Sequence, residues 1–208
     1  MPEYVLDTVA LRTMAFAHPR GVSILLEALA APSARFPAEV YNQDEDRLPL
    51  SAFDDVLSEL ARGIRFTQRQ ISALPMSGAQ RYRSWLENST QLTGHFRDGS
   101  LLIDPLTVDE IPRRESFRQD YGIGRGEAAC LVLVERYQAQ GVFLSSDEPA
   151  CKVAQHRGFA YVTLAQILES WVDRAKPTED SLDMLIAGMR MARFGLTEGF
   201  AADLKRRL

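Results

Sequence analysis

The stretch that decides the fold is residues 121–158, with the sequence YGIGRGEAACLVLVERYQAQGVFLSSDEPACKVAQHRG. A glycine-rich segment leads into an apolar helix opened by Glu127, and a short apolar strand then ends at Asp147. The apolar run from Ala128 to Val134 is expected of a helix that packs on a sheet and is covered on its other sides. One acid therefore stands at a helix start and another at a strand end, in the most hydrophobic part of the chain.

Outward from this stretch, short apolar strands alternate with helical patterns. The spacing is that of βαβ units, which predicts an α/β fold with a mainly parallel sheet and helices on both faces. The expected strands are residues 4–6, 101–103, 142–144 and 161–162. The expected helices around them are residues 8–17, 22–30, 127–140, 149–157 and 164–172.

The expected domain organisation is one domain over residues 1–175, with a helical insertion at about 47–119, and a helical tail over 176–208. Within the insertion, helices are expected at 53–64, 68–74 and 78–86, and a loop at 93–100. The tail contains two amphipathic segments, residues 182–191 and 198–207, which are expected to pack on the domain as helices.

The composition of the 208 residues, 46% hydrophobic and 25% charged, is that of an ordinary globular protein. No apolar run approaches the roughly 20 residues that cross a bilayer, and the N-terminus lacks the pattern of a signal peptide. Cys130 and Cys151 have neither metal-ligand spacing nor a disulfide framework. We therefore expect no membrane association and a reducing, cytoplasmic location.

The net charge of −4 does not indicate a nucleic-acid binder, but the charge is unevenly distributed. From Arg62 to Arg125 there are ten Arg, no Lys and seven acids, which gives +3 and leaves −7 for the rest of the chain. The planar guanidinium suits phosphate better than an ammonium does, although this chain prefers Arg throughout. The arginine-rich stretch is a candidate for substrate binding or partner contact.

Three acids are expected to meet at one edge of the sheet. Asp7 follows the first expected strand and Asp147 a later one, and ligands of open α/β sheets bind at the carboxyl ends of the strands. Glu127 reaches the same edge if the glycine-rich loop before its helix crosses over. Carboxylates that gather repel one another unless a cation intervenes, and hard oxygen ligands suit Mg²⁺ or Mn²⁺. Such ions bind a phosphodiester and activate a water.

Structural roles for two of these acids stay open. Asp147 precedes Glu148-Pro149 and is a good helix N-cap, while Glu127 in a first helical turn is favoured by the helix dipole alone. Ser145 and Ser146 are candidates for orienting a metal ligand, but simple strand-end hydrogen bonding is their expected role. The glycine-rich segment before Glu127 lacks the Lys-Ser/Thr of a phosphate loop.

Several short motifs together resemble those of the PIN-domain family, in its branch of toxin-type ribonucleases. They are YVLDT at 4–8, FPAEVY at 36–41, GRGEAA at 124–129, SSDEPA at 145–150 and MARFGLT at 191–197. The resemblance covers roughly residues 1–43 and 120–208. It implies a three-layer α/β/α fold and an Mg²⁺- or Mn²⁺-dependent endoribonuclease in which Asp7, Glu127 and Asp147 hold the metal. It also implies an RNA substrate, and it leaves room for a toxin role with a small antitoxin-type partner and for a homodimer.

The fourth acid of the family pattern falls on Gln43 in this chain. Asp44 and Glu45 follow directly and are further catalytic candidates, so the fourth acid is Asp44, Glu45 or absent. A degenerate PIN fold that binds nucleic acid or protein with weak or no catalysis is therefore the alternative function. A haloacid-dehalogenase-type phosphatase is disfavoured, because Val9 occupies the position where that family requires a second Asp.

Overall fold

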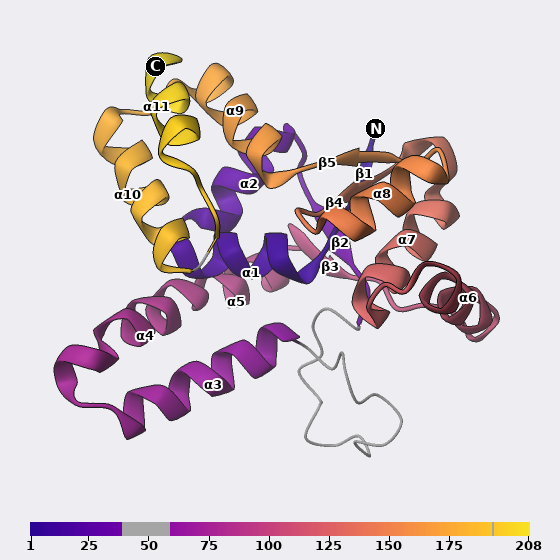
Figure 1. Cartoon of the computed structure of the whole chain (residues 1–208), viewed down its shortest axis with the longest axis horizontal. Coiled ribbons are helices and arrows are strands. Elements are labelled where there is room, and N and C mark those ends of the chain that lie inside the picture. Colours follow the sequence, from indigo (N-terminus) through magenta and orange to yellow (C-terminus); the bar gives the residue numbers. More distant parts are fainter. Residues whose placement is uncertain (39–58, 193) are drawn as a thin grey trace. The chain divides into compact units, whose positions relative to one another are not determined.

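The structure is a computed structural model that describes residues 1–38, 59–192 and 194–208 (Figure 1). Its centre is a five-stranded sheet with the order β3-β2-β1-β4-β5, in which every strand pair is parallel. The α/β class and the parallel sheet are thereby confirmed. The strands are β1 (Glu3–Leu6), β2 (Ala34–Phe36), β3 (Leu101–Ile103), β4 (Gly141–Leu144) and β5 (Ala160–Val162).

Helices make up most of the remaining described chain, and those predicted on either side of β4 are confirmed. The α-helices are α1 (Thr8–Ala17), α2 (Gly21–Leu29), α3 (Glu59–Ala73), α4 (Met76–Ser89), α5 (Gln91–Arg97), α6 (Ile111–Tyr121), α7 (Arg125–Tyr137), α8 (Glu148–His156), α9 (Leu164–Ala175), α10 (Glu179–Met191) and α11 (Glu198–Arg206). The described residues also include the 3₁₀ turns η3 (Val108–Glu110) and η4 (Gln138–Gln140).

The loop predicted at residues 93–100 is wrong for residues 93–97, because α5 continues to Arg97, and is confirmed for residues 98–100. This polar segment is held by Gln91, whose side-chain amide donates to the carbonyl oxygens of Ala15 and His18 and accepts from the N–H of Val22. Such distant hydrogen bonds override a weak local preference for loop. The helix predicted at 68–74 coincides with the end of the longer α3 to within one residue, and the helix predicted at 78–86 lies within α4. The first half of the helix predicted at 53–64 lies outside the described residues, and its second half lies in α3.

The chain divides into two compact units. One contains the sheet and consists of the described parts of Met1–Ala10, Ser33–Arg62 and Ser100–Leu164. The other consists of Leu11–Pro32, Gly63–Gly99 and the described part of Ala165–Leu208. The segment predicted as an insertion therefore supplies strand β3 to the first unit and α4 and α5 to the second.

In the first unit, α7 packs against the two central strands β1 and β4. The thiol of Cys130 donates to the carbonyl oxygen of Leu6 at 3.4 Å, near the end of β1. At the start of β4, a Cβ on Gly141 would lie only 2.5 Å from the carbonyl oxygen of Val134, so the close approach of the chain requires glycine. Together these contacts show that α7 runs antiparallel to β1 and β4, with its N-terminus at the carboxyl edge of the sheet.

In the second unit, α10 makes a similarly close approach to α1. A Cβ on Gly188 would lie 1.8 Å from the carbonyl oxygen of Ala17, so only glycine lets the two backbones meet. The two helices predicted in the tail are confirmed as α10 and α11, each capped by a threonine hydroxyl, from Thr178 and Thr197. Among the described residues, no helix combines the length and the apolarity needed to cross a membrane.

Candidate metal site at the carboxyl edge of the sheet

Asp7 lies at the carboxyl end of β1, in the middle of the sheet. Its side chain is buried, with the residue only 2% exposed, and its backbone N–H donates to the carbonyl oxygen of Leu144 on the neighbouring strand. The N–H of Thr8 donates to Oδ1 at 2.6 Å, and the hydroxyl of Ser145 donates to Oδ2 at 2.7 Å. A buried carboxylate is costly unless such hydrogen bonds or a cation stabilise it, so its position is tightly specified.

Ser145 connects Asp7 to Asp147. It is fully buried directly after β4, and its hydroxyl accepts from the N–H of Asp147 at 3.1 Å while donating to Asp7. The register explains the contact, because Leu6 on β1 pairs with Leu144 on β4 and places the following residues side by side. The prediction of strand-end hydrogen bonds for this serine is confirmed, and it donates one of these hydrogen bonds to the carboxylate of Asp7.

Asp147 is the N-cap of α8, as the structural alternative predicted. Its Oδ1 accepts from the N–H of Ala150 at 2.9 Å. Within the described part of the chain, Oδ2 has no hydrogen bond and no ion pair reaches this carboxylate. One oxygen of Asp147 thus stabilises the helix start while the second remains available, so capping and metal binding are compatible in one side chain.

A buried thiol, that of Cys151, lies beside Ser145. Cys151 donates weakly to the carbonyl oxygen of Ser145 at 3.6 Å. Burial and, to a smaller extent, the negative charges of Asp147 and Asp7 together raise the pKa of the Cys151 thiol to about 11. The thiol is therefore neutral near pH 7.

Glu127 lies in the first turn of α7, at the same edge of the sheet. It precedes Cys130 by three residues and so shares its helix face, one turn beyond the contact with Leu6. Its carboxylate turns back over the helix start, where Oε2 would be 2.3 Å from a Cβ on Gly124. The glycine at this N-cap position leaves the space that the carboxylate occupies.

The structure therefore joins Asp7 and Asp147 through Ser145 and places Glu127 at their edge with its carboxylate directed to Gly124. Among the described residues, no three His, Cys, Asp or Glu side chains form a group close enough to hold a metal ion. Gln43, Asp44 and Glu45 lie outside the described residues. The described centre of the site is the pair Asp7–Asp147.

The pair fits a hard divalent cation. Both side chains offer carboxylate oxygens, the ligands that Mg²⁺ and Mn²⁺ prefer, and the donors from Thr8 and Ser145 to Asp7 are uncharged. A hydrogen bond to a carboxylate that binds a metal orients that carboxylate. The hydroxyl of Ser145 donates such a hydrogen bond to Asp7.

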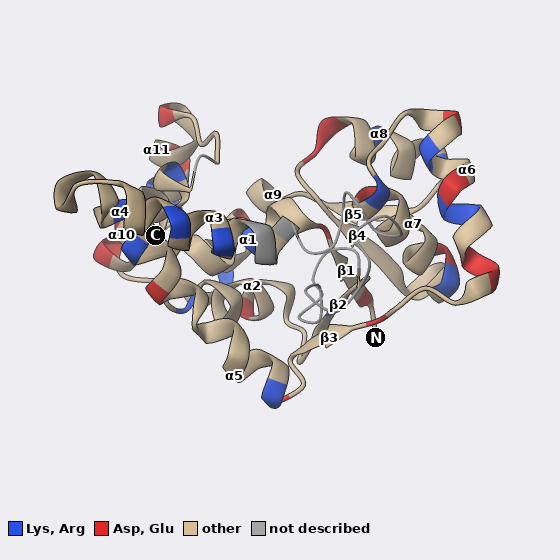
Figure 2. Cartoon of the chain, turned by 90° about the horizontal axis from the view of Figure 1, so that it is seen from below, with Lys and Arg blue, Asp and Glu red and all other residues tan. Residues whose placement is uncertain are grey.

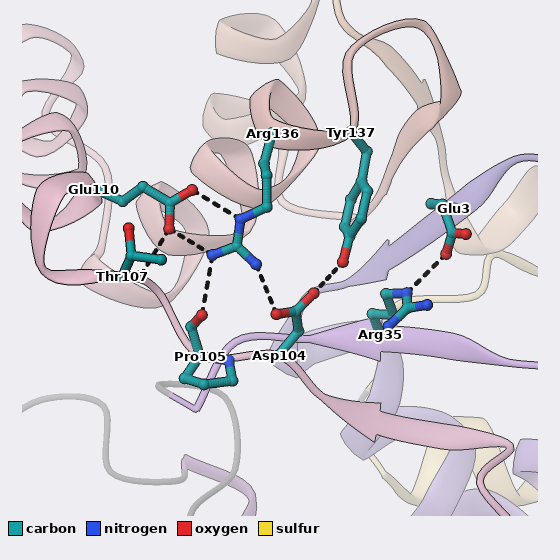
Figure 3. Close-up of polar contacts among 8 residues, drawn as sticks. All are labelled: Glu3, Arg35, Asp104, Pro105, Thr107, Glu110, Arg136 and Tyr137. Carbon is teal, nitrogen blue, oxygen red and sulfur yellow. Dashed lines mark hydrogen bonds and ion pairs between the residues drawn. The ribbon is translucent and has the colours of Figure 1, made fainter.

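A second acidic cluster lies where β3 ends (Figure 3). Asp104 follows β3, and Arg136 near the end of α7 donates to its Oδ1 at 2.6 Å and to Oε1 of Glu110 at 2.8 Å. The hydroxyl of Tyr137 donates to the other oxygen of Asp104. Hydrogen bonds from Arg136 lower the pKa of Glu110 to about 2, and burial together with the bond to Asp104 raises the pKa of Tyr137 to about 12.

Comparisons with family models, with curated proteins and with solved structures find nothing that matches this chain. The PIN resemblance accordingly rests on the short sequence motifs alone. The function proposed below depends on the geometry of Asp7, Ser145 and Asp147.

Proposed function

We propose that this chain is a divalent-metal-dependent nuclease with a PIN-like α/β/α fold, acting on RNA. The observation that carries the proposal is the hydroxyl of Ser145, which joins Asp7 to Asp147 at the carboxyl ends of two neighbouring central strands. In parallel α/β sheets this edge is where ligands bind. Asp7 and Asp147 are the proposed ligands of Mg²⁺ or Mn²⁺, with Glu127 as the third.

When bound, such an ion supplies positive charge for a phosphodiester and lowers the pKa of water. The protein's part is to hold the acids that bind it. Asp7 is held by burial and by hydrogen bonds from Thr8 and Ser145, and Asp147 is held by the start of α8. Preorganised carboxylates avoid reorganisation when charge develops in the transition state.

The cleavage test compares purified wild-type protein with the Asp147→Asn variant on a single-stranded RNA in the presence of Mn²⁺. We expect cleavage by the wild type and its loss with EDTA, and a decrease on the order of a thousandfold in the variant. Asparagine keeps the N-cap, so helix α8 remains intact. Cleavage that persists at the wild-type rate in Asp147→Asn would disprove the site assignment.

A second candidate function is a degenerate PIN fold that binds nucleic acid or protein without cleavage. The observation that favours it is the carboxylate of Glu127, which is directed to Gly124. Titration calorimetry with Mn²⁺ distinguishes the two functions. The nuclease binds Mn²⁺ and loses that binding in Asp7→Asn, whereas the binding module takes up no metal. A toxin role, a small antitoxin-type partner and a homodimer rest on the family resemblance alone.

A further inference from the structure

The helices α3 and α4 of the second unit carry an excess of positive charge, visible as their blue segments in Figure 2. From Gly63 to Gly99 there are five arginines and two acids, Glu87 and Asp98, so this part carries +3 while the whole chain carries −4. The five are Arg65, Arg69, Arg81, Arg83 and Arg97. Local positive charge on an acidic protein indicates an anionic ligand for this surface.

One of these arginines lies against an aromatic ring, and a second shares a helix face with an exposed one. The ring of Phe66, a residue 47% exposed, meets the buried ring of Tyr82 edge-on, with 6.0 Å between the centroids. The guanidinium of Arg81 lies 4.6 Å from the centre of the Tyr82 ring and donates to its hydroxyl at 2.6 Å. Arg69 follows Phe66 by three residues and shares its helix face. These four residues are called the Arg–aromatic patch below.

We propose that the Arg–aromatic patch binds single-stranded RNA. In this complex Arg69 and Arg81 bind phosphates, and an unpaired base stacks on the ring of Phe66. A guanidinium offers five N–H donors in a planar fork that matches phosphate. The contact of Arg81 with Tyr82 uses one of these groups and fixes the orientation of the others. An exposed aromatic ring between cations suits single strands, because their bases are free to stack.

The charges of Arg69 and Arg81 are available to a ligand. Both side chains are exposed, and neither forms an ion pair with an acidic side chain among the described residues. Acidic side chains alone would pair with the arginines without contacting the exposed ring of Phe66, whereas every nucleotide of RNA supplies both a phosphate and a base. RNA is therefore the ligand that fits the patch.

The inference rests on the proposed function in naming RNA as the polymer, and it is tested without cleavage. Binding of a fluorescent single-stranded RNA of about 12 nucleotides is followed by anisotropy in EDTA, using Asp147→Asn protein. Arg69→Gln and Arg81→Gln are each expected to weaken binding about five- to tenfold and to lower the slope of log K against log salt by about 0.7. Phe66→Ala is expected to weaken binding with the slope unchanged.

The matched control is Arg83→Gln, which removes the same charge from the same helix. Residues two apart point to opposite sides of a helix, so Arg83 faces away from Arg81, and it lines a hollow with Met76, Ser77 and Gln80. We expect it to change affinity by less than about twofold. Thermal unfolding of each variant confirms that α3 and α4 remain folded.

Three results would contradict the proposal that the Arg–aromatic patch binds RNA. Equal weakening by Arg83→Gln and Arg81→Gln would mean diffuse electrostatic attraction, and absence of RNA binding at low salt would mean no site. Competition by a poly-glutamate peptide as strong as that by RNA would assign the surface to an acidic protein partner. Each of these leaves the cleavage result for the wild type untouched. Conversely, RNA binding without Mn²⁺-dependent cleavage refutes only the nuclease proposal.

Discussion

Two acidic clusters lie in the same unit at the carboxyl ends of strands, and they differ in what stabilises them. Asp104 after β3 accepts from Arg136, and the same guanidinium binds Glu110 (Figure 3). Asp7 after β1 accepts from a backbone N–H and a hydroxyl, and Asp147 from a backbone N–H. A guanidinium bound to a carboxylate balances its charge and serves the fold, whereas the neutral N–H and hydroxyl donors to Asp7 and Asp147 orient these carboxylates without balancing their charge.

The largest expected effect comes from exchanging an acid for its amide in each cluster. Asp147→Asn is expected to reduce RNA cleavage on the order of a thousandfold and to leave stability nearly unchanged, because Asn caps α8 as well as Asp does. Asp104→Asn is expected to retain cleavage and to lower the free energy of unfolding by about 1–3 kcal/mol, because Arg136 loses a charged partner. Initial cleavage rates and urea unfolding measure the two effects.

The assignment of a structural role to Asp104 and a metal-binding role to Asp147 is wrong if Asp104→Asn abolishes cleavage while the protein keeps its full stability. Asp104 would then belong to the catalytic edge, and the division of the acids into two roles would be wrong.

The next effect concerns the hydroxyl between Asp7 and Asp147. Ser145→Ala is expected to lower cleavage about 10- to 100-fold and to raise the Mn²⁺ concentration needed for half-maximal rate, because Asp7 loses a positioning hydrogen bond. Ser146→Ala is the matched control, since its hydroxyl accepts from the N–H of Leu164 at 3.1 Å and is expected to affect stability alone. Equal Mn²⁺ requirements in the two variants would contradict a positioning role for Ser145.

The sequence was sufficient for the class of fold and for the position of Asp7 and Asp147. Hydrophobic runs such as residues 142–144 and their spacing predicted parallel strands, and the strand-end rule then placed both acids at one edge. The bridge by Ser145 was not predictable, because it joins side chains 138 residues apart and depends on the register of β1 and β4. Local patterns carry no information about register between distant strands.

The rule that ligands bind at the carboxyl ends of parallel strands does not distinguish the two acidic clusters from each other. Asp104 follows the apolar strand at residues 101–103 just as Asp147 follows that at 142–144. Only the fold shows that Arg136, 32 residues further along, lies against Asp104. The same reason explains α5, whose helical state depends on the distant bonds of Gln91.

The smallest expected effect is the acid dependence of stability, which tests the cluster balanced by Arg136. The pKa of Glu110 is lowered to about 2 in the folded protein from an ordinary value near 4.5, mainly by the hydrogen bonds from Arg136. A lowered pKa means that the folded state favours the ionised form. The stabilisation is therefore present above about pH 4.5 and is lost as the pH falls toward 2. For a partly exposed group we expect about 1–2 kcal/mol.

Urea unfolding between pH 5 and pH 2 measures this loss, and Glu110→Gln should flatten it because the variant has no proton to take up at this site. Glu148→Gln is the matched control, since Glu148 is exposed and pairs with Lys152 one turn away on the surface of α8, so the acid dependence of this variant should remain that of the wild type. If Glu110→Gln retains the full acid dependence, the charge of Glu110 does not stabilise the fold. Arg136 would then be balanced by Asp104 alone, and the two clusters would differ less than their hydrogen bonds indicate.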